Sequence, residues 1–145
     1  MSTTPTPEIR QCFDGALRDF LPELGLTSEA DVAWPNSGFD PNVEHLYLRP
    51  AFLPGATAAA SLGTDGFERL TGVYQISVLE VADVGLSNAE EIARKLVDRF
   101  RGGKVLDCCG SRVTITTAYS GTPITEDGRL HIPVSVVWYC YAQKS

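Results

Sequence analysis

Few side chains in this sequence stand where they could do chemistry together. His45 follows Glu44, and a base beside a carboxylate could serve acid–base catalysis. Neighbouring residues of an extended segment point to opposite faces, however, so these two cannot cooperate directly. The second histidine, His131, alternates outward between Leu130 and Ile132 and is predicted to lie on the surface. The sequence therefore predicts no catalytic residue.

The four cysteines offer no metal-binding pattern. Cys12, Cys108, Cys109 and Cys140 include no Cys-x-x-Cys pair, and two histidines do not complete a zinc site. Cys12 lies on a helical apolar stripe and Cys140 on the inward side of a strand, so both are predicted to be small core residues. Cys108 and Cys109 are predicted to be reduced structural thiols, with a redox switch as the alternative. Nucleophile-elbow, phosphate-loop and dinucleotide motifs are absent, so we expect neither metal nor cofactor.

Length and composition are those of a single folded domain. The chain has 145 residues, of which 43% are hydrophobic and 21% charged. We expect one domain over residues 1–145, with residues 1–5 disordered. The net charge of −6 argues against a nucleic-acid partner, which would need clustered Lys and Arg. We find neither a secretory signal nor an apolar run of about 20 residues, so we expect a cytoplasmic protein with no membrane span.

Two amphipathic helices are predicted. The first begins near Thr6, and Pro22 and Gly25 place its end between Phe20 and Leu24. Its apolar residues recur at steps of three and four: Ile9, Cys12, Phe13, Ala16, Leu17, Phe20, Leu21 and Leu24.

The second helix is predicted from about Asn88 to Arg101. Ser87 and Glu90 form the pattern of a capping box at its start, and Gly102 follows its end. Positive charge gathers near that end and is predicted to be a solvated face with Glu90 to Arg94 and Glu91 to Lys95 pairs. The cations are Arg94, Lys95, Arg99, Arg101 and Lys104.

Three strands are predicted from alternating apolar residues. In the segment from Gly72 to Val78, the buried side carries Tyr74, Ile76 and Val78. In a second strand the buried side carries Val113, Ile115, Thr117 and Tyr119. In the last strand one parity is apolar from Leu130 to Cys140, and the opposite parity becomes apolar from Val137 onward, which implies two covered faces. Pro133 predicts an edge or a bulge in its early part.

The segment between Val32 and Leu70 is predicted to be a long excursion in which prolines separate extended pieces such as Glu44 to Phe52. Its aromatic residues are Trp34, Phe39, Tyr47, Phe52 and Phe67. Such residues are typical of protein interfaces. The alternative is that the excursion folds back and buries them as a satellite core. Arg49 is either an anchor of the interface or a fixed surface charge. The predicted interface comprises Trp34, Phe39, Tyr47, Arg49, Phe52, Val137, Tyr139 and Tyr141.

The expected elements combine into an α+β fold, a mainly antiparallel sheet with two helices packed on one face. Residues throughout the chain resemble those of the tail terminator-like proteins of tailed bacteriophages. The resemblance lies in Trp34, Pro35, Asn36, Phe39, Pro41, Tyr47, Leu48, Arg49, Leu53, Pro54, Gly55, the segment from Gly72 to Ile76, the helix from Ala89 to Phe100, the segment from Pro133 to Val136, and Trp138. These are core and turn residues and carry no catalytic signature.

The resemblance implies the same fold and a non-enzymatic role in virion assembly. Members of that family form rings, commonly hexameric, that cap the tail tube, stop its polymerisation and offer a surface to head-completion proteins. The implied partners are other copies of this chain, the major tail tube protein and a head-completion or connector protein. The implied location is the virion tail, reached from the host cytoplasm.

Two alternatives remain open at this stage. One is a neck or head-completion connector protein, since similar small α+β folds serve that role. The other is a small cytosolic enzyme or ligand-binding domain that uses the excursion as a lid. An enclosed pocket lined by Trp34, Tyr47 and Phe67 would support the second alternative, and a solvent-open surface would remove it.

Overall fold

Two helices and six strands make up the part of the chain that the structure describes. A computed structural model describes residues 6–35, 38–40, 45–59, 67–81, 85–108, 111–126 and 128–143. The elements are α1 (Thr6–Leu24), β1 (Tyr47–Ala59), β2 (Phe67–Val81), α2 (Ser87–Arg99), β3 (Val105–Cys108), β4 (Ser111–Ser120), β5 (Ile124–Glu126) and β6 (Arg129–Gln143). Residues 1–5, predicted to be disordered, lie outside the described ranges.

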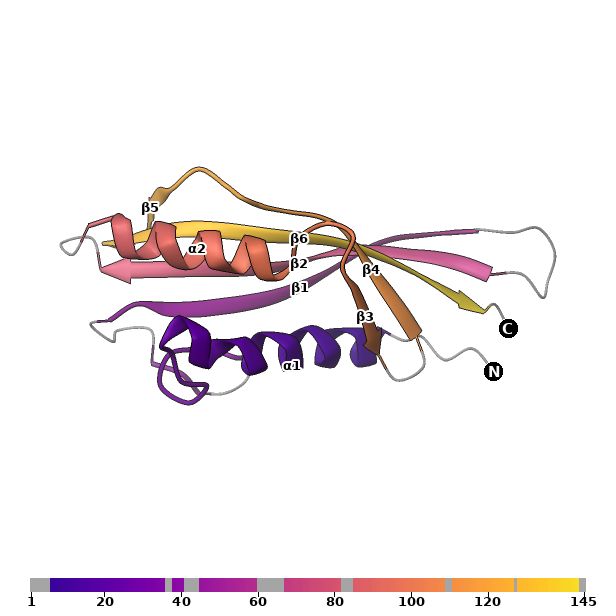
Figure 1. Cartoon of the computed structure of the whole chain (residues 1–145), viewed down its shortest axis with the longest axis horizontal. Coiled ribbons are helices and arrows are strands. Elements are labelled where there is room, and N and C mark those ends of the chain that lie inside the picture. Colours follow the sequence, from indigo (N-terminus) through magenta and orange to yellow (C-terminus); the bar gives the residue numbers. More distant parts are fainter. Residues whose placement is uncertain are drawn as a thin grey trace.

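The strands form one antiparallel sheet in the order β1-β2-β6-β4-β3, and the short β5 pairs with the start of β6. At the centre, β2 and β6 pair along their full length, from Phe67 opposite Gln143 to Val81 opposite Arg129. Figure 1 shows β1, β2 and β6 running most of the length of the molecule, with β3 and β4 crossing them at a steep angle. The predicted α+β fold is confirmed.

Both helices pack on one face of the sheet, as predicted. The ring of Phe13 on α1 stacks on Tyr74 of β2 at 4.9 Å and also contacts Phe100 and Trp138, at 6.3 and 6.2 Å between ring centroids. All four side chains are at most 2% exposed. An aromatic cluster therefore joins α1, the end of α2 and the two central strands. Apolar burial of this kind is the main stabilising term in a domain of this size.

A strand glycine makes room for part of this core. Gly72 lies opposite Trp138, and the ring of Trp138 covers it so closely that a Cβ atom there would lie 2.6 Å from Cζ2. Across the glycine, Phe52 of β1 stacks on the same indole at 5.5 Å. The sequence needs glycine here because a side chain would separate the two rings.

The end of α1 lies where the sequence predicts it. The amide of Gly25, at φ 73°, donates to the carbonyl oxygen of Pro22, and the amide of Leu26 donates to that of Leu21, both at 3.1 Å. This pair of bonds is a Schellman motif, which satisfies carbonyls that the last helical turn leaves free.

The predicted capping box at the start of α2 is wrong. Leu86 is the N-cap residue and no side chain bonds the free amides there, while Ser87 is already helical. Instead, the carboxylate of Glu80, which is 3% exposed at the end of β2, accepts a 3.2 Å bond from the side chain of Asn88 and a 2.9 Å bond from the amide of Val81. A buried anion beside a helix N-terminus is favoured by the helix dipole.

A bulge in β4 overturns part of the predicted alternation. Val113 and Ile115 are fully buried as expected, but the pairing with β6 shifts between Ile115 and Thr117. The shift turns the rest of the strand over, so that Thr117 is exposed and Tyr119 is 52% exposed. One inserted residue moves each later side chain of the strand to the opposite face of the sheet.

Two further expectations are corrected. Residues 53–59 and 67–70, predicted to belong to an irregular excursion, lie in β1 and β2, although the pairing of these two strands shifts register between Pro54 and Thr57. Pro133 lies at neither an edge nor a bulge but within the central strand β6, at the point where its neighbour changes from β5 to β4. Its carbonyl oxygen accepts the amide of Gly121 at 2.7 Å, so the missing N–H falls in the gap between those two neighbours.

Cys12 differs from its predicted role, whereas Cys140 agrees with it. Cys12 is half-buried and disulfide-bonded, and its sulfur lies 3.6 Å from the carbonyl oxygen of Asp107, which places α1 beside β3. Cys140 is a free, buried thiol whose pKa is raised by that burial. The side chains of Cys108 and Cys109 lie outside the described part of the structure.

Candidate protein interface

The sheet face opposite the helices carries three of the residues predicted for an interface. Val137, Tyr139 and Tyr141 project from β6 on the parity opposite to the buried Trp138. The rings of Tyr139 and Tyr141 meet edge to face, 5.7 Å between centroids, and Tyr141 is 52% exposed. Both helices lie on the other face, so the second covered face expected for this strand is not supplied by α1 or α2.

Three more side chains extend this apolar surface across the sheet. Leu53 of β1 lies opposite Val73, which lies opposite Val137, and Tyr119 of β4 lies opposite Ser135. Leu53 is 47% exposed. We define the open-face patch as Leu53, Val73, Tyr119, Val137, Tyr139 and Tyr141. Sequence reasoning missed Leu53 because β1 was expected to be irregular, and missed Tyr119 because the bulge could not be foreseen.

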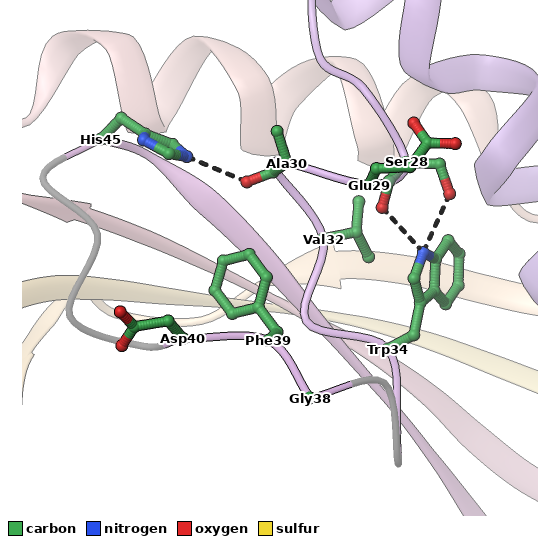
Figure 2. Close-up of a pocket in the computed structure, with 9 residues that line it drawn as sticks. All are labelled: Ser28, Glu29, Ala30, Val32, Trp34, Gly38, Phe39, Asp40 and His45. Atoms are coloured by element: carbon green, nitrogen blue, oxygen red, sulfur yellow. Dashed lines mark hydrogen bonds between the residues drawn. The ribbon is translucent and has the colours of Figure 1, made fainter.

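A second group of predicted residues surrounds an open pocket between the end of α1 and β1. Figure 2 shows Trp34 and Phe39 on either side of Val32, with His45 nearby. The indole Nε1 of Trp34 donates to the carbonyl and hydroxyl oxygens of Ser28, at 3.2 and 3.0 Å. The pocket has a volume of about 570 Å³. Its walls come from the chain between α1 and β1, which the parallel bridge between Val32 and Leu48 attaches to the sheet.

The remaining three predicted residues lie apart from the pocket lining. Tyr47 is 3% exposed beneath the guanidinium of Arg129 and the ring of Phe39, at 5.0 and 4.8 Å. Arg49 is half-buried opposite Ser77, and Phe52 is half-buried against the core. In the isolated chain Tyr47 therefore belongs to a satellite core, the alternative expected for this region, and the part of these three residues in an interface stays a prediction.

The two histidines lie in different surroundings. His45 precedes β1 in a bend, where Nε2 lies 3.0 Å from Asp31 Oδ1 and 3.0 Å from the carbonyl oxygen of Ala30. His131 is only 7% exposed, between Leu79 of β2 and Ile124 of β5, so its predicted surface position is wrong. Among the described residues, no group of three or more His, Cys, Asp or Glu side chains could hold a metal ion.

The hydroxyl of Tyr74 has a strongly raised pKa because it lies in the core. Tyr74 Oη donates to Asp14 Oδ1 at 2.5 Å across the aromatic core. Burial, together with the charge of Asp14, raises the pKa of Tyr74 far above its ordinary value of 10.0. The group therefore stays a donor at any physiological pH and ties α1 to β2.

Comparison with known proteins decides the family. The family model described as "Phage tail terminator protein" matches residues 12–138, which is most of the chain. This chain belongs to the phage tail terminator family. The family is structural, and membership gives the chain a role in phage tail assembly.

Solved structures agree with this terminator fold. One structure, whose name states no function, is 28% identical, covers 94% of each chain and superposes with a TM-score of 0.71. No curated protein matches this chain. No helix within its described residues is long and apolar enough to cross a membrane. The match to the family model ends at residue 138. It therefore includes all of the predicted interface residues except Tyr139 and Tyr141.

Proposed function

We propose that this protein forms a ring that caps the phage tail tube, ends tube polymerisation and presents the surface to which head-completion proteins attach. Family membership over residues 12–138 is the observation that carries the proposal. Rings of six copies are the expected form. Assembly takes place in the host cytoplasm, and the finished ring remains in the virion tail.

The open-face patch suits docking on the tube protein or on a connector protein. It places two exposed tyrosines and an exposed leucine on a sheet surface that neither helix covers. Tyrosine is enriched at the energetic centres of interfaces, because its ring buries a large area at little entropic cost while its hydroxyl tolerates water. Tyr119, Tyr141 and Leu53 are therefore the side chains that we expect to become buried on assembly.

The β1 edge of the sheet is less suited to association. On β1, the amide of Leu48 donates to the carbonyl oxygen of Asp31 and its carbonyl accepts the amide of Ala33, at 2.9 and 2.7 Å, so this edge is occupied there. By strand alternation, Pro50 and Pro54 face the same edge and have no N–H to offer. Subunits should therefore not extend the sheet at the β1 edge.

Electron microscopy of particles made without this protein tests the proposal. Loss of a terminator leaves the tube free to grow, so overlong tails are expected. Tailless but filled heads would instead identify a connector protein and contradict the proposal. Restoring the wild-type gene should return tails to uniform length, which serves as the control.

The pocket does not support an enzyme or a ligand-binding lid. It is open to solvent rather than enclosed, its lining includes Trp34 but not Tyr47, and Phe67 has no described side chain. His45, which borders it, has a side chain 46% exposed. A dry pocket with converging polar groups was the condition for that alternative.

A further inference from the structure

A cluster of cations lies where α2 ends and the chain turns toward β3. Arg99, Arg101 and Lys104 line one side of a surface pocket of about 450 Å³, together with the two glycines of the turn. None of the three cations forms an ion pair with a carboxylate in the described ranges. Asp98 also lines the pocket, but its Oδ2 accepts a 3.1 Å bond from Arg94, which is paired with Glu91 as well. We call these three cations the basic cluster.

The basic cluster is held in place by the fold. The guanidinium of Arg99 lies 5.3 Å from the ring centroid of Phe20, and its Nε is buried without a hydrogen-bond partner. Lys104 Nζ donates to the carbonyl oxygen of Arg99 at 3.2 Å. Burial and the neighbouring charge of Arg99 lower the pKa of Lys104. Like charges held together in this way would be relieved by an anion.

The open pocket in Figure 2 has the opposite character. The carboxylates of Glu29 and Asp40 lie at its borders, both residues are exposed, and its walls include Trp34 and Phe39. Carboxylates beside aromatic rings are the groups that hold a guanidinium or an ammonium, through charge-assisted hydrogen bonds and cation–π contacts. Another cation already uses the indole, since Arg18 lies 4.8 Å from its centroid. We call Glu29, Trp34, Phe39 and Asp40 the acidic pocket.

The net charge favours a contact of this kind. Each copy carries a formal charge of −6, so copies in a ring repel one another unless opposite charges meet at their contacts. The basic cluster and the acidic pocket share no residue, so they can form a head-to-tail contact that repeats around a closed ring.

We propose that the basic cluster of one copy docks in the acidic pocket of the next copy. This inference rests on the proposed ring and deepens it by naming the surfaces that close it. Arg101, which is exposed, approaches the aromatic walls, and the carboxylates of Glu29 and Asp40 at the borders attract the incoming cations. The open-face patch remains available for the tube or the connector.

Charge exchange between the two surfaces tests this contact by sedimentation velocity, with tube protein present if the ring needs it. The first variant carries Arg101→Glu and Lys104→Glu, and the second carries Glu29→Lys and Asp40→Lys. Either variant by itself places like charges at every contact between copies. The fraction of that variant found in rings should therefore fall about tenfold or more. An equimolar mixture can alternate around an even-numbered ring with every contact matched, so mixing should restore rings.

The control variant carries Arg10→Glu, an exposed cation of α1 that lies outside both surfaces and outside the open-face patch. It changes the net charge as much as the single variant Arg101→Glu, which should weaken rings, and it should itself leave ring formation intact. Circular dichroism checks each fold, and if a reversal unfolds the chain, the milder Arg101→Gln should still weaken rings measurably. Rings from either charge-reversed variant alone, or no recovery on mixing, would overturn this contact while leaving the proposed cap standing. A wild-type chain that never forms rings, even with tube protein, would overturn both.

Discussion

The two faces of the central sheet carry the same kinds of side chain but differ in what covers them. Under the helices, Tyr74 and Trp138 are at most 2% exposed and stack with Phe13. On the opposite face, Tyr139 and Tyr141 contact each other, and Tyr141 is half-exposed. Trp138 and Tyr139 are neighbours in sequence, so strand parity alone sends one to the core and the other to the open face. The contrast predicts that substitutions on the first face change stability and those on the second change association.

The largest effect on stability is expected from Trp138→Ala. It removes the indole that packs on Phe13, Phe52 and Gly72, and truncation of a buried tryptophan costs about 3 to 5 kcal/mol. Urea unfolding of the monomer measures the loss. A cost below about 1 kcal/mol would show that the aromatic core is not what holds the helices to the sheet.

Gly72→Ala should follow, with a cost of about 1 to 3 kcal/mol. The new Cβ would lie 2.6 Å from Trp138 Cζ2 and 2.8 Å from the carbonyl oxygen of Leu53, and neither atom can move freely. Gly15→Ala is the matched control, because nothing lies within 4 Å of a Cβ there and alanine favours helix. Equal melting temperatures for the two variants would contradict the close approach.

Tyr74→Phe should cost about 1 to 2 kcal/mol, because it removes the hydrogen bond to a charged carboxylate. The raised pKa of Tyr74 also predicts how the stability of the fold depends on pH. The neutral hydroxyl stabilises the fold fully below pH 10, and this contribution falls above that pH, where the unfolded tyrosine ionises. Wild type should therefore lose more stability than Tyr74→Phe between pH 9 and about 11. Parallel losses in the two proteins would contradict the assignment.

The smallest stability effect is expected on the open face. Tyr139→Asp should cost the monomer about 1 kcal/mol through its low strand propensity, while disrupting assembly. Tyr139→Phe, which keeps the ring, should assemble normally. Unfolding of the monomer by Tyr139→Asp would place this side chain in the core instead.

The regular parts of the fold could be predicted from local pattern. The stripe on α1, the turn at Gly25, the buried parity of β2 and the parity of β6 all follow from periodicity that the structure confirms. The corrections have non-local causes. The bulge near Thr116 depends on pairing with β6, and the start of α2 is stabilised by Glu80 from a strand rather than by Ser87.

The candidate interface was only partly visible in the sequence. Strand parity in the sequence placed Val137, Tyr139 and Tyr141 on one face, and aromatic composition identified Trp34 and Phe39, but neither showed which residues of other strands lie beside them. Leu53 joins the patch through its register with Val73, and the basic cluster meets Phe20 through helix packing. Such neighbours depend on how distant segments pair, which no local spacing encodes.

Sedimentation velocity of the wild-type protein, alone and with the major tail tube protein, tests most directly whether this chain works by association. The account predicts a single closed oligomer, either at once or on addition of tube protein, and tubes that stop lengthening when the oligomer is present. A monomer that ignores tube protein at every concentration, with tubes growing past it unchanged, would contradict the account.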